Sequence, residues 1–364
     1  MKILLLSAYD AISHQYWRKG LVATFPEYEW TVLTLPARFF SWRIRGNSLS
    51  WAFQQQEILS QDYDLLIATS MVDLTSLRGF IPSLAQTPTL VYFHENQFAY
   101  PPSGKEYTSV EPRILNLYNA LCGDRLLFNS RYNLKTLLAG SEALLKKLPD
   151  QVPAGLIQRI EERACIQPVP LPDQIFLPHQ PTKGPLSIVW NHRWEFDKGP
   201  DRLLAAIKIV QDSGTDFRLH IVGQQFRQLP KVFSTLRTRL SDQQQLGMFG
   251  HIADVNEYRH LLQTSDIVLS TALHDFQGIA VLEGVACGCY PVVPDRLAYQ
   301  ELFPAECRYA ETSEAASLAN LLTRLSHAKS AGTLPSAPAV DHLSWSASRA
   351  AWQRMMLDTA GAPL

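Results

Sequence analysis

Two carboxylates, Asp275 and Glu283, bracket a polar turn that leads into a predicted helix. An apolar strand over residues 266–271 precedes the turn at 274–278, and helical sequence follows over 279–286. Unbonded N–H groups and the positive end of the helix dipole make the start of such a helix a site for anions. Because carboxylates accept hydrogen bonds from hydroxyl groups, acids beside an anion site favour a ligand with phosphates and hydroxyls, such as a nucleotide sugar.

Arg193 and Lys198 lie on either side of a turn that follows another apolar strand, at 187–191. Two cations at this spacing can converge on one diphosphate, since guanidinium and ammonium groups both bind phosphate oxygens. The alternative is a pair of surface salt bridges, Arg193 with Glu195 and Lys198 with Asp197. We predict the diphosphate contact.

Two polar stretches in the first half of the chain also follow apolar strands. Ser13 and His14 come after the strand at 3–7, where they are candidates to contact donor or acceptor. The alternative is that Ser13 caps a helix and the histidine is satisfied internally. A run of four polar residues follows the strand at 90–93 and consists of His94, Glu95, Asn96 and Gln97. This run predicts a site that binds sugar hydroxyls or positions an acceptor.

The segment 34–45, which we interpret as a loop, combines three arginines with three aromatic residues and has no acid. These residues are Arg38, Arg43 and Arg45 with Phe39, Phe40 and Trp42. Arginine pairs with phosphates and aromatic rings stack on bases, so the segment is the best local signal for nucleic acid in the chain. Basic and aromatic loops are also common in proteins that bind no nucleic acid, and that alternative stays open.

The composition places few further constraints on function. The chain has 364 residues, enough for two domains, and a formal net charge of −1. A charge near zero argues for no global attraction to nucleic acid or membrane, so a nucleic-acid site must be a local patch. No apolar run approaches the length of a membrane span, and residues 1–7 are typical of a first strand rather than a signal peptide. The five cysteines have no paired spacing and fit a cytoplasmic protein without membrane association.

Strands alternate with helix-length segments throughout the chain, which predicts α/β architecture with parallel sheets. A proline-rich stretch at 168–185 separates two such halves. We predict two Rossmann-like domains, 1–178 and 179–340, whose parallel sheets face a ligand cleft, followed by a helical segment at 341–364. The Asp62-Tyr-Asp64 sequence precedes its strand and so lies at the wrong edge of the sheet for a metal-binding D-x-D motif. We expect no metal.

The spacing from Asp275 to Glu283, with an aromatic residue and a glycine after the first acid, resembles the E-x7-E motif of retaining glycosyltransferases of the two-domain GT-B type. Asp275 stands where that motif usually has Glu, and Asp is one methylene shorter. The resemblance implies that the helical segment at 341–364 crosses back to the first domain. It implies that Arg193 and Lys198 hold the donor diphosphate in place of a metal. It also implies donor contacts from two further segments, namely Gly250, His251 and Ile252, and Phe276, Gln277, Gly278 and Ile279.

Several motifs together resemble more narrowly the tRNA-queuosine α-mannosyltransferase family. The first consists of residues 34–37 together with the following Trp42-Arg43. The others are residues 92–97, 128–130, 190–198, 287–291 and 301–306. The resemblance implies a retaining enzyme that transfers mannose from GDP-mannose to the cyclopentenediol of queuosine in the anticodon of tRNA-Asp. It implies a nucleotide sugar and queuosine-containing tRNA-Asp as partners, with no metal or other cofactor.

The same resemblance implies a role for each candidate residue. Glu283 would accept hydrogen bonds from the ribose, while Asp275 and His94 would contact the transferred sugar. Together with Arg193 and Lys198 these three form the expected catalytic set. The departing phosphate would take the proton of the acceptor, so no general base is needed from the protein. The acceptor side would consist of Ser13, His14, Arg38, Trp42, Arg43, Glu95, Asn96 and Gln97.

Two other functions remain open on the sequence. One is a GT-B glycosyltransferase that uses another nucleotide sugar on a glycan, lipid or small molecule. The other is a nucleotide-sugar-binding module without catalysis, which the change to Asp275 favours. A nicotinamide enzyme is disfavoured because no G-x-G-x-x-G sequence follows the first strand.

Overall fold

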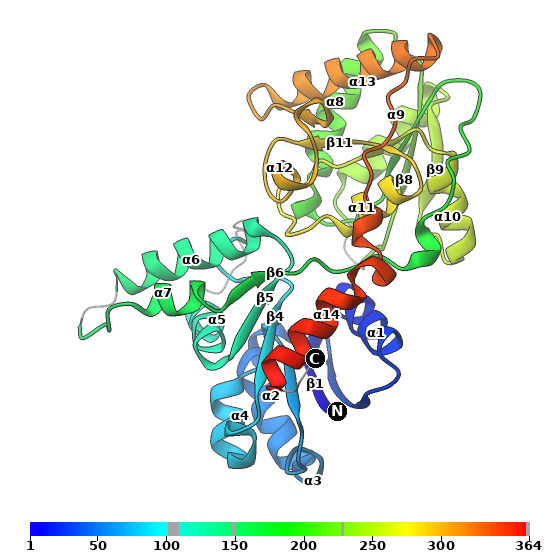
Figure 1. Cartoon of the computed structure of the whole chain (residues 1–364). Helices are drawn as coiled ribbons and strands as arrows, with labels where there is room; N and C mark the ends of the chain where they lie inside the picture. Colours follow the sequence, from blue (N-terminus) through cyan, green and yellow to red (C-terminus); the bar gives the residue numbers. More distant parts are fainter. Residues whose placement is uncertain (101–108, 148–149, 227–228, 362–364) are drawn as a thin grey trace. The chain divides into compact units, whose positions relative to one another are not determined.

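The computed structural model describes residues 1–100, 109–147, 150–226 and 229–361 (Figure 1). The remaining residues, which fall within the predicted domain and tail ranges, lie outside the described part. The chain forms two compact units, one of Met1–Pro170 with Trp345–Leu364 and one of Leu171–Ser344. These divisions lie a few residues from the predicted ones at 178 and 340.

The first unit is a six-stranded sheet in the order β2-β1-β3-β4-β5-β6, with every neighbouring pair parallel. Its strands are β1 (Lys2–Asp10), β2 (Glu29–Pro36), β3 (Leu65–Thr69), β4 (Thr89–Phe93), β5 (Arg125–Phe128) and β6 (Ala164–Ile166). Its helices are α1 (Ile12–Thr24), α2 (Phe40–Gln54), α3 (Gln56–Leu59), α4 (Leu74–Phe80), α5 (Glu111–Cys122), α6 (Arg131–Leu145), α7 (Leu156–Glu161) and α14 (Trp345–Ala360). A 3₁₀ turn covers Pro82–Ala85.

The second unit is another six-stranded parallel sheet, in the order β12-β11-β10-β7-β8-β9. Its strands are β7 (Leu186–Trp190), β8 (Phe217–Val222), β9 (Leu246–Gly250), β10 (Ile267–Leu269), β11 (Tyr290–Pro294) and β12 (Arg308–Tyr309). Its helices are α8 (Pro200–Asp212), α9 (Val232–Asp242), α10 (Val255–Thr264), α11 (Ile279–Ala286), α12 (Tyr299–Leu302) and α13 (Glu314–Ser330). Short 3₁₀ turns cover Asp173–Ile175, Phe196–Lys198, Ala305–Cys307 and Asp341–Leu343.

The central strands are continuous apolar runs because helices cover both faces of each parallel sheet. All five residues of β3, β4 and β7 are buried. The sequence prediction of α/β architecture with two Rossmann-like sheets is therefore confirmed.

Two boundaries predicted in the first unit were wrong, and the alternative interpretation of Ser13 as a helix cap fails as well. The first strand is longer than the predicted 3–7, because β1 continues to Asp10 and α1 begins at Ile12. Ser13 is not the residue that precedes α1, since Ala11 holds that position without a capping side-chain bond. The expected loop at 34–45 is largely structured, since β2 ends at Pro36 and α2 begins at Phe40. The edge strand β6 went unrecognised because its three residues are too few to show a pattern.

The last helix, α14, packs in the first unit although its sequence follows the whole second unit (Figure 1). It contacts α1, β3 and β4. The indole of Trp345 lies against Gly20, where an added Cβ would come within 2.3 Å of the ring. Trp352 is fully buried beside Trp17 and Tyr92.

Buried asparagine side chains form hydrogen bonds to the loops at the carboxyl edge of the first sheet. Asn119 donates from Nδ2 to the carbonyls of Ser70 and Val72 at 2.8 and 2.6 Å, just after β3. Asn129 donates to the carbonyl of His94 at 2.8 Å, just after β4. Because a buried carbonyl without a partner is costly, these amides hold the loops in one conformation.

Candidate functional site

In the second unit, the loops after β7 and β10 lie side by side because these strands are neighbours in the sheet. Gly199 has φ of 65°, and a Cβ there would come within 2.1 Å of the carbonyl oxygen of Thr271. Thr271 in turn donates from Oγ1 to the carbonyl of Lys198 at 2.8 Å. The two loops are thus in direct backbone contact, which brings the sequence around Lys198 to the start of α11.

Lys198 is buried between these loops, with only 8% of its surface exposed. Its Nζ donates to the carbonyl of His274 at 2.8 Å. It also lies 3.5 Å from carboxylate oxygens of both Asp197 and Asp275. The cation is therefore held in one place at the carboxyl edge of the sheet.

Asp275 lies in the turn before α11 and is held by groups from three elements. Its Oδ1 accepts from the backbone N–H of Gly278 at 2.8 Å, and its Oδ2 accepts from the hydroxyl of Tyr299 at 3.3 Å. Burial by itself raises the pKa of this carboxyl, but Lys198 and then His192 and the Gly278 N–H outweigh it and lower the pKa to about 2. Asp275 is an anion at neutral pH and an acceptor of hydrogen bonds.

Gly278 directly precedes α11 with φ of 76°, a conformation that glycine adopts without strain. A Cβ at this position would come within 2.7 Å of the Tyr299 ring. Phe276 and Gln277 are buried in the same turn, and Ile279 is the first residue of the helix. The turn is therefore a compact structure that presents the start of α11.

Glu283 lies in the second turn of α11 and belongs to a separate polar network. Its Oε2 accepts from the hydroxyl of Tyr258 at 2.9 Å. That hydroxyl accepts from Nδ2 of Asn191 at 2.9 Å, and Asn191 also donates to the carbonyl of Ala280 at 2.7 Å. The residues that orient Glu283 thus come from α10 and from the end of β7.

Arg193 is half exposed, with its guanidinium near two acids. It lies 2.8 Å from Glu195 and 3.7 Å from Asp197. Both salt bridges of the alternative interpretation therefore form, since Lys198 also lies near Asp197. Exposed ion pairs contribute about 0–1 kcal/mol, so an anionic ligand can compete for Arg193 at little cost.

His192, which the sequence analysis did not single out, is buried between Arg193 and the end of β7. Burial lowers its pKa to about 4, and Lys198 contributes in the same direction. Its Nε2 is buried and has no hydrogen-bond partner within the described residues. A neutral imidazole therefore lies beside the Lys198–Asp275 pair. Tyr258, Asn191 and Tyr299 were missed as well, because only the tertiary fold brings them to the acids.

The predicted base-binding segment at 250–252 is farther along the same edge. It begins at Gly250, the last residue of β9, and β9 lies two strands from β7 in the sheet. The carbonyl of Gly250 accepts from the N–H of Gly223 at 3.1 Å, His251 is exposed and Ile252 packs against the core. Within the described residues no hydrogen bond or ion pair joins this segment to Lys198 or Asp275.

In the first unit, His14 and His94 stack on each other with ring centroids 4.2 Å apart. His14 Nε2 lies 3.0 Å from a carboxylate oxygen of Glu95. Burial, and secondarily His14, hold the pKa of His94 well below its usual value. The fold thus brings three predicted residues together in a cluster that contains the contact of His14 with Glu95 and a neutral His94.

Asn96 and Gln97 both have hydrogen-bond partners within the first unit. Asn96 is fully buried and donates to Asn133 Oδ1 and Thr136 Oγ1, each at 2.8 Å. The N–H of Gln97 donates to Asn116 at 2.7 Å. Ser13 is exposed in the first turn of α1. The four-residue run at 94–97 is therefore divided between a candidate site and the frame that supports it.

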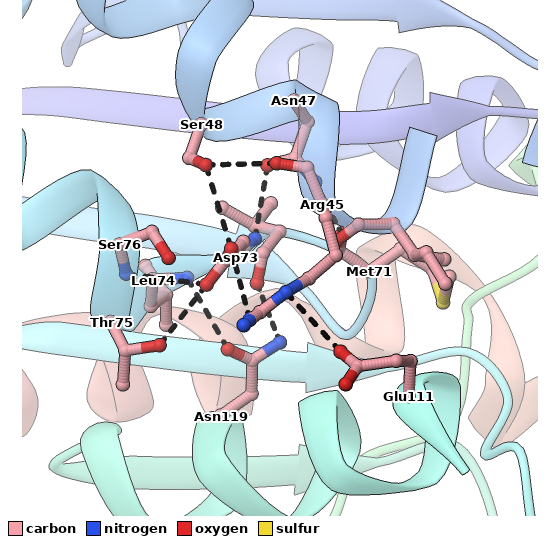
Figure 2. Close-up of polar contacts among 12 residues, drawn as sticks. Arg45, Asn47, Ser48, Met71, Asp73, Leu74, Thr75, Ser76, Glu111 and Asn119 are labelled. Atoms are coloured by element: carbon pink, nitrogen blue, oxygen red, sulfur yellow. Dashed lines mark hydrogen bonds and ion pairs between the residues drawn. The ribbon is translucent and has the colours of Figure 1, made fainter. Parts of the chain in front are cut away.

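The arginines of the segment 34–45 have different environments. Figure 2 shows Arg45 between Asp73, at 3.2 Å, and Glu111, at 3.3 Å. Asp73 also accepts from the N–H of Ser76 at 3.2 Å, so Arg45 links α2 to the start of α4. Arg38 is exposed, whereas Arg43 is only 7% exposed. Two acids that are far from this segment in the sequence therefore neutralise one of its arginines, Arg45.

The described residues contain no cluster of acids, histidines or cysteines that could hold a metal ion. Among the helices that the structure describes, none has the length and apolar character needed to cross a bilayer.

Comparison with protein families divides the chain in two. Residues 2–171 match the family described as tRNA-queuosine alpha-mannosyltransferase N-terminal, and residues 174–331 match glycosyl transferases group 1. A tRNA-queuosine alpha-mannosyltransferase of Drosophila melanogaster is 31% identical over 319 residues, which cover 84% of this chain and 83% of that protein. A GDP-mannose-dependent alpha-(1-6)-phosphatidylinositol dimannoside mannosyltransferase of Mycobacterium tuberculosis is 30% identical over 131 residues, 35% of this chain and 32% of that protein.

Solved structures share the fold at low identity. Sucrose-phosphate synthase of Thermosynechococcus elongatus has a TM-score of 0.67 at 14% identity, with 99% of this chain and 100% of that chain covered. Anabaena HepE, solved in complex with UDP and glucose, has a TM-score of 0.63 at 15% identity, with both chains covered completely. The two α/β units therefore form the GT-B fold, as predicted.

Proposed function

Because this chain belongs to the tRNA-queuosine alpha-mannosyltransferase family, we propose that it transfers mannose from GDP-mannose to the cyclopentenediol of queuosine in the anticodon of tRNA-Asp. The family places it among the glycosyltransferases. The names of two relatives support the sugar, and one of them also specifies GDP-mannose. The partners are the nucleotide sugar and the tRNA, which together favour a cytoplasmic location.

One observation carries the donor side of the proposal, namely the contact of Lys198 and Asp275 at the start of α11. A fixed cation from one loop lies beside a fixed anion and a helix N-terminus from the neighbouring loop, which suits a ligand that has a diphosphate next to a sugar. Lys198 and Arg193 bind the diphosphate and stabilise the charge that develops on it as the glycosidic bond breaks. Asp275 accepts a hydrogen bond from a hydroxyl of the transferred sugar.

Glu283 and His94 complete the expected contacts. The hydroxyl of Tyr258 orients Glu283 by donating to one carboxylate oxygen at 2.9 Å, and a carboxylate can accept several hydrogen bonds at once, including those from a ribose. His94 contacts the sugar as a neutral imidazole. The acceptor hydroxyl attacks on the face that the phosphate leaves, the configuration is retained, and the phosphate takes the proton. No metal is required, because Lys198 and Arg193 supply the positive charge.

The test is transfer of labelled mannose from GDP-mannose to two pools of total tRNA. One pool contains queuosine and the other comes from cells that cannot make it. We expect label in the first pool only. Label in both pools would show that the acceptor is a tRNA group other than queuosine.

Label in neither pool, with GDP still raising the Tm of the protein, would contradict the proposed donor and acceptor together. Transfer in that case should be sought with other nucleotide sugars and with glycan, lipid or small-molecule acceptors. A protein that binds nucleotide sugars and transfers nothing would be the binding module considered above.

A further inference from the structure

Two aromatic side chains at the start of α2 are exposed to solvent in spite of their size. Phe39 is 71% exposed and Trp42 is 56% exposed. Neither belongs to the core cluster of the first unit, whereas the adjacent Phe40 packs against it. Burying such rings against a ligand is favourable, so their exposure needs an explanation other than folding.

The backbone and its neighbours fix both rings in place. Phe39 precedes α2 with φ of 54° and ψ of 53°, a left-handed conformation that is strained for a residue with a side chain. The indole of Trp42 lies flat on Gly46, where an added Cβ would come within 2.2 Å of the ring. One face of the indole is thus supported by the helix while more than half of the side chain stays exposed.

The same turn provides positive charge that the protein does not neutralise. Arg43 is 93% covered, its Nε is completely buried without a partner, and no ion pair to Arg43 or Arg38 occurs within the described residues. The guanidinium of Arg38 lies 5.6 Å from the centre of the Phe39 ring. Because a covered cation without a counter-charge is costly, this turn suits an anionic ligand.

We propose that Phe39 and Trp42 stack on two bases of a single-stranded RNA, while Arg43 binds the phosphate between them and Arg38 an adjacent one. This inference rests on the proposed function and deepens it, since it assigns the RNA to a defined surface. Rings that alternate with arginines are how proteins hold unpaired nucleotides. A base inside a duplex could not stack on them, so the acceptor must be bound as an open loop.

The position of this surface in the fold agrees with that role. The turn follows the carboxyl end of β2, and α1 with His14 follows the carboxyl end of the adjacent β1. The rings of Tyr9, in β1, and Phe40 meet edge to face at 5.7 Å and tie the two segments together. The stacking surface therefore lies along the same sheet edge as the His14–Glu95 pair.

The experiment measures binding of the full-length protein to a short RNA hairpin without queuosine, in the absence of donor. A fully paired RNA duplex of the same strand is the comparison. We expect the hairpin to bind more tightly than the duplex. Trp42→Ala should weaken hairpin binding roughly five- to a hundredfold, and Trp42→Phe should restore part of the affinity. Arg43→Gln should lower the slope of log Kd against log salt concentration by about 1.

Phe53→Ala is the matched control, because Phe53 lies on the same helix and is also 71% exposed, but no arginine lies over its ring among the described residues. It should bind the hairpin as the unchanged protein does. The variant Phe39→Gly distinguishes a loss of RNA binding from a loss of folding stability. Glycine relieves the left-handed strain, so the Tm should be equal or higher while the hairpin affinity falls.

Equal hairpin affinity in Trp42→Ala and Phe53→Ala, or equal affinity for hairpin and duplex, would overturn the inference. A loss in Phe53→Ala as large as in Trp42→Ala would also overturn it and indicate a general apolar docking face for a protein. A different result would contradict the proposed function and leave this inference intact. If hairpin binding depends on Trp42 but no tRNA accepts mannose, the transfer reaction is wrong and the RNA surface stands.

Discussion

At the scale of single residues, the charge of Asp275 is the feature on which the donor site most depends. Asp275→Asn keeps the size of the side chain but replaces an anion near Lys198 by a neutral amide. A charge-assisted hydrogen bond contributes about 1.5–3 kcal/mol. If it acts in the transition state, the initial rate of mannose transfer should fall roughly ten- to a hundredfold.

Asp212→Asn is the control for this change, since Asp212 is a 77% exposed acid of the same unit. Its transfer rate should equal that of the unchanged protein. Equal rates for the two variants would exclude a role of Asp275 in the reaction.

The buried His192 predicts a pH dependence of stability in the second unit. Its pKa is about 4 in the folded protein against an ordinary value of 6.5, so folding favours the neutral form. An unfolded chain takes up this proton near pH 6.5. The stability of the fold that depends on a neutral His192 is therefore fully present above pH 6.5. It is lost as the pH falls toward about 4. The loss of unfolding free energy over that interval is about 3 kcal/mol.

Measurements of Tm at a series of pH values test this dependence. His192→Gln should show a smaller decrease of Tm between pH 6.5 and about 4 than the unchanged protein. His220 also has a pKa of about 4, through burial and the neighbouring Arg218, so part of the dependence should remain. Replacement of both histidines should remove more of it. An unchanged pH profile in His192→Gln would contradict a buried neutral histidine.

Sequence alone was enough to find the residues that carry charge at this edge. Arg193, Lys198, Asp275 and Glu283 could be grouped because each follows a predicted strand of one parallel sheet, and such strands end at the same edge. The residues that orient them could not be found in this way. Tyr258 lies on α10, which has no motif, and its contact with Glu283 depends on how that helix packs.

At the scale of elements, the contact between the loops after β7 and β10 should be sensitive to a single methyl group. Gly199→Ala places a Cβ against the backbone carbonyl of Thr271, which cannot move without shifting its strand. We expect a loss of about 2–4 kcal/mol of unfolding free energy, from overlap and left-handed strain together. Thermal or urea unfolding measures it, and GDP binding should weaken because Lys198 is displaced.

Gly214→Ala is a close control, because Gly214 has φ of 70° and open space around it. Only the left-handed strain of about 1 kcal/mol should remain in that variant. Similar losses for the two alanines would show that the loops are not in contact.

Element boundaries were the weakest part of the sequence prediction. The stretch 34–45 has no helical apolar period, since exposed Trp42 and buried Arg43 reverse the usual pattern. The helix there is fixed by tertiary bonds, such as the one from the N–H of Asp73 to Asn47 at 3.0 Å. Long buried strands such as β3 and β4 were predicted well because their apolar runs are unambiguous.

At the scale of the whole molecule, the first unit is discontinuous in sequence, because α14 belongs to it. Trp352 of that helix is fully buried and lies 5.3 Å from the ring of Tyr92 and 5.9 Å from that of Trp17. Both of these rings contact His94 edge to face. The final helix therefore supports a candidate site residue through one layer of aromatic side chains.

Trp352→Ala should consequently destabilise the first unit by about 3–5 kcal/mol and leave the second unit unchanged. Because each unit has its own core, calorimetry should resolve two transitions, and GDP should raise the one that belongs to the second unit. Arg354→Ala, at an exposed position of the same helix, should leave both transitions in place. A fall in the GDP-sensitive transition of Trp352→Ala would instead mean that α14 stabilises the second unit. A fall in the other transition alone would show that α14 is part of the cooperative fold of the first unit.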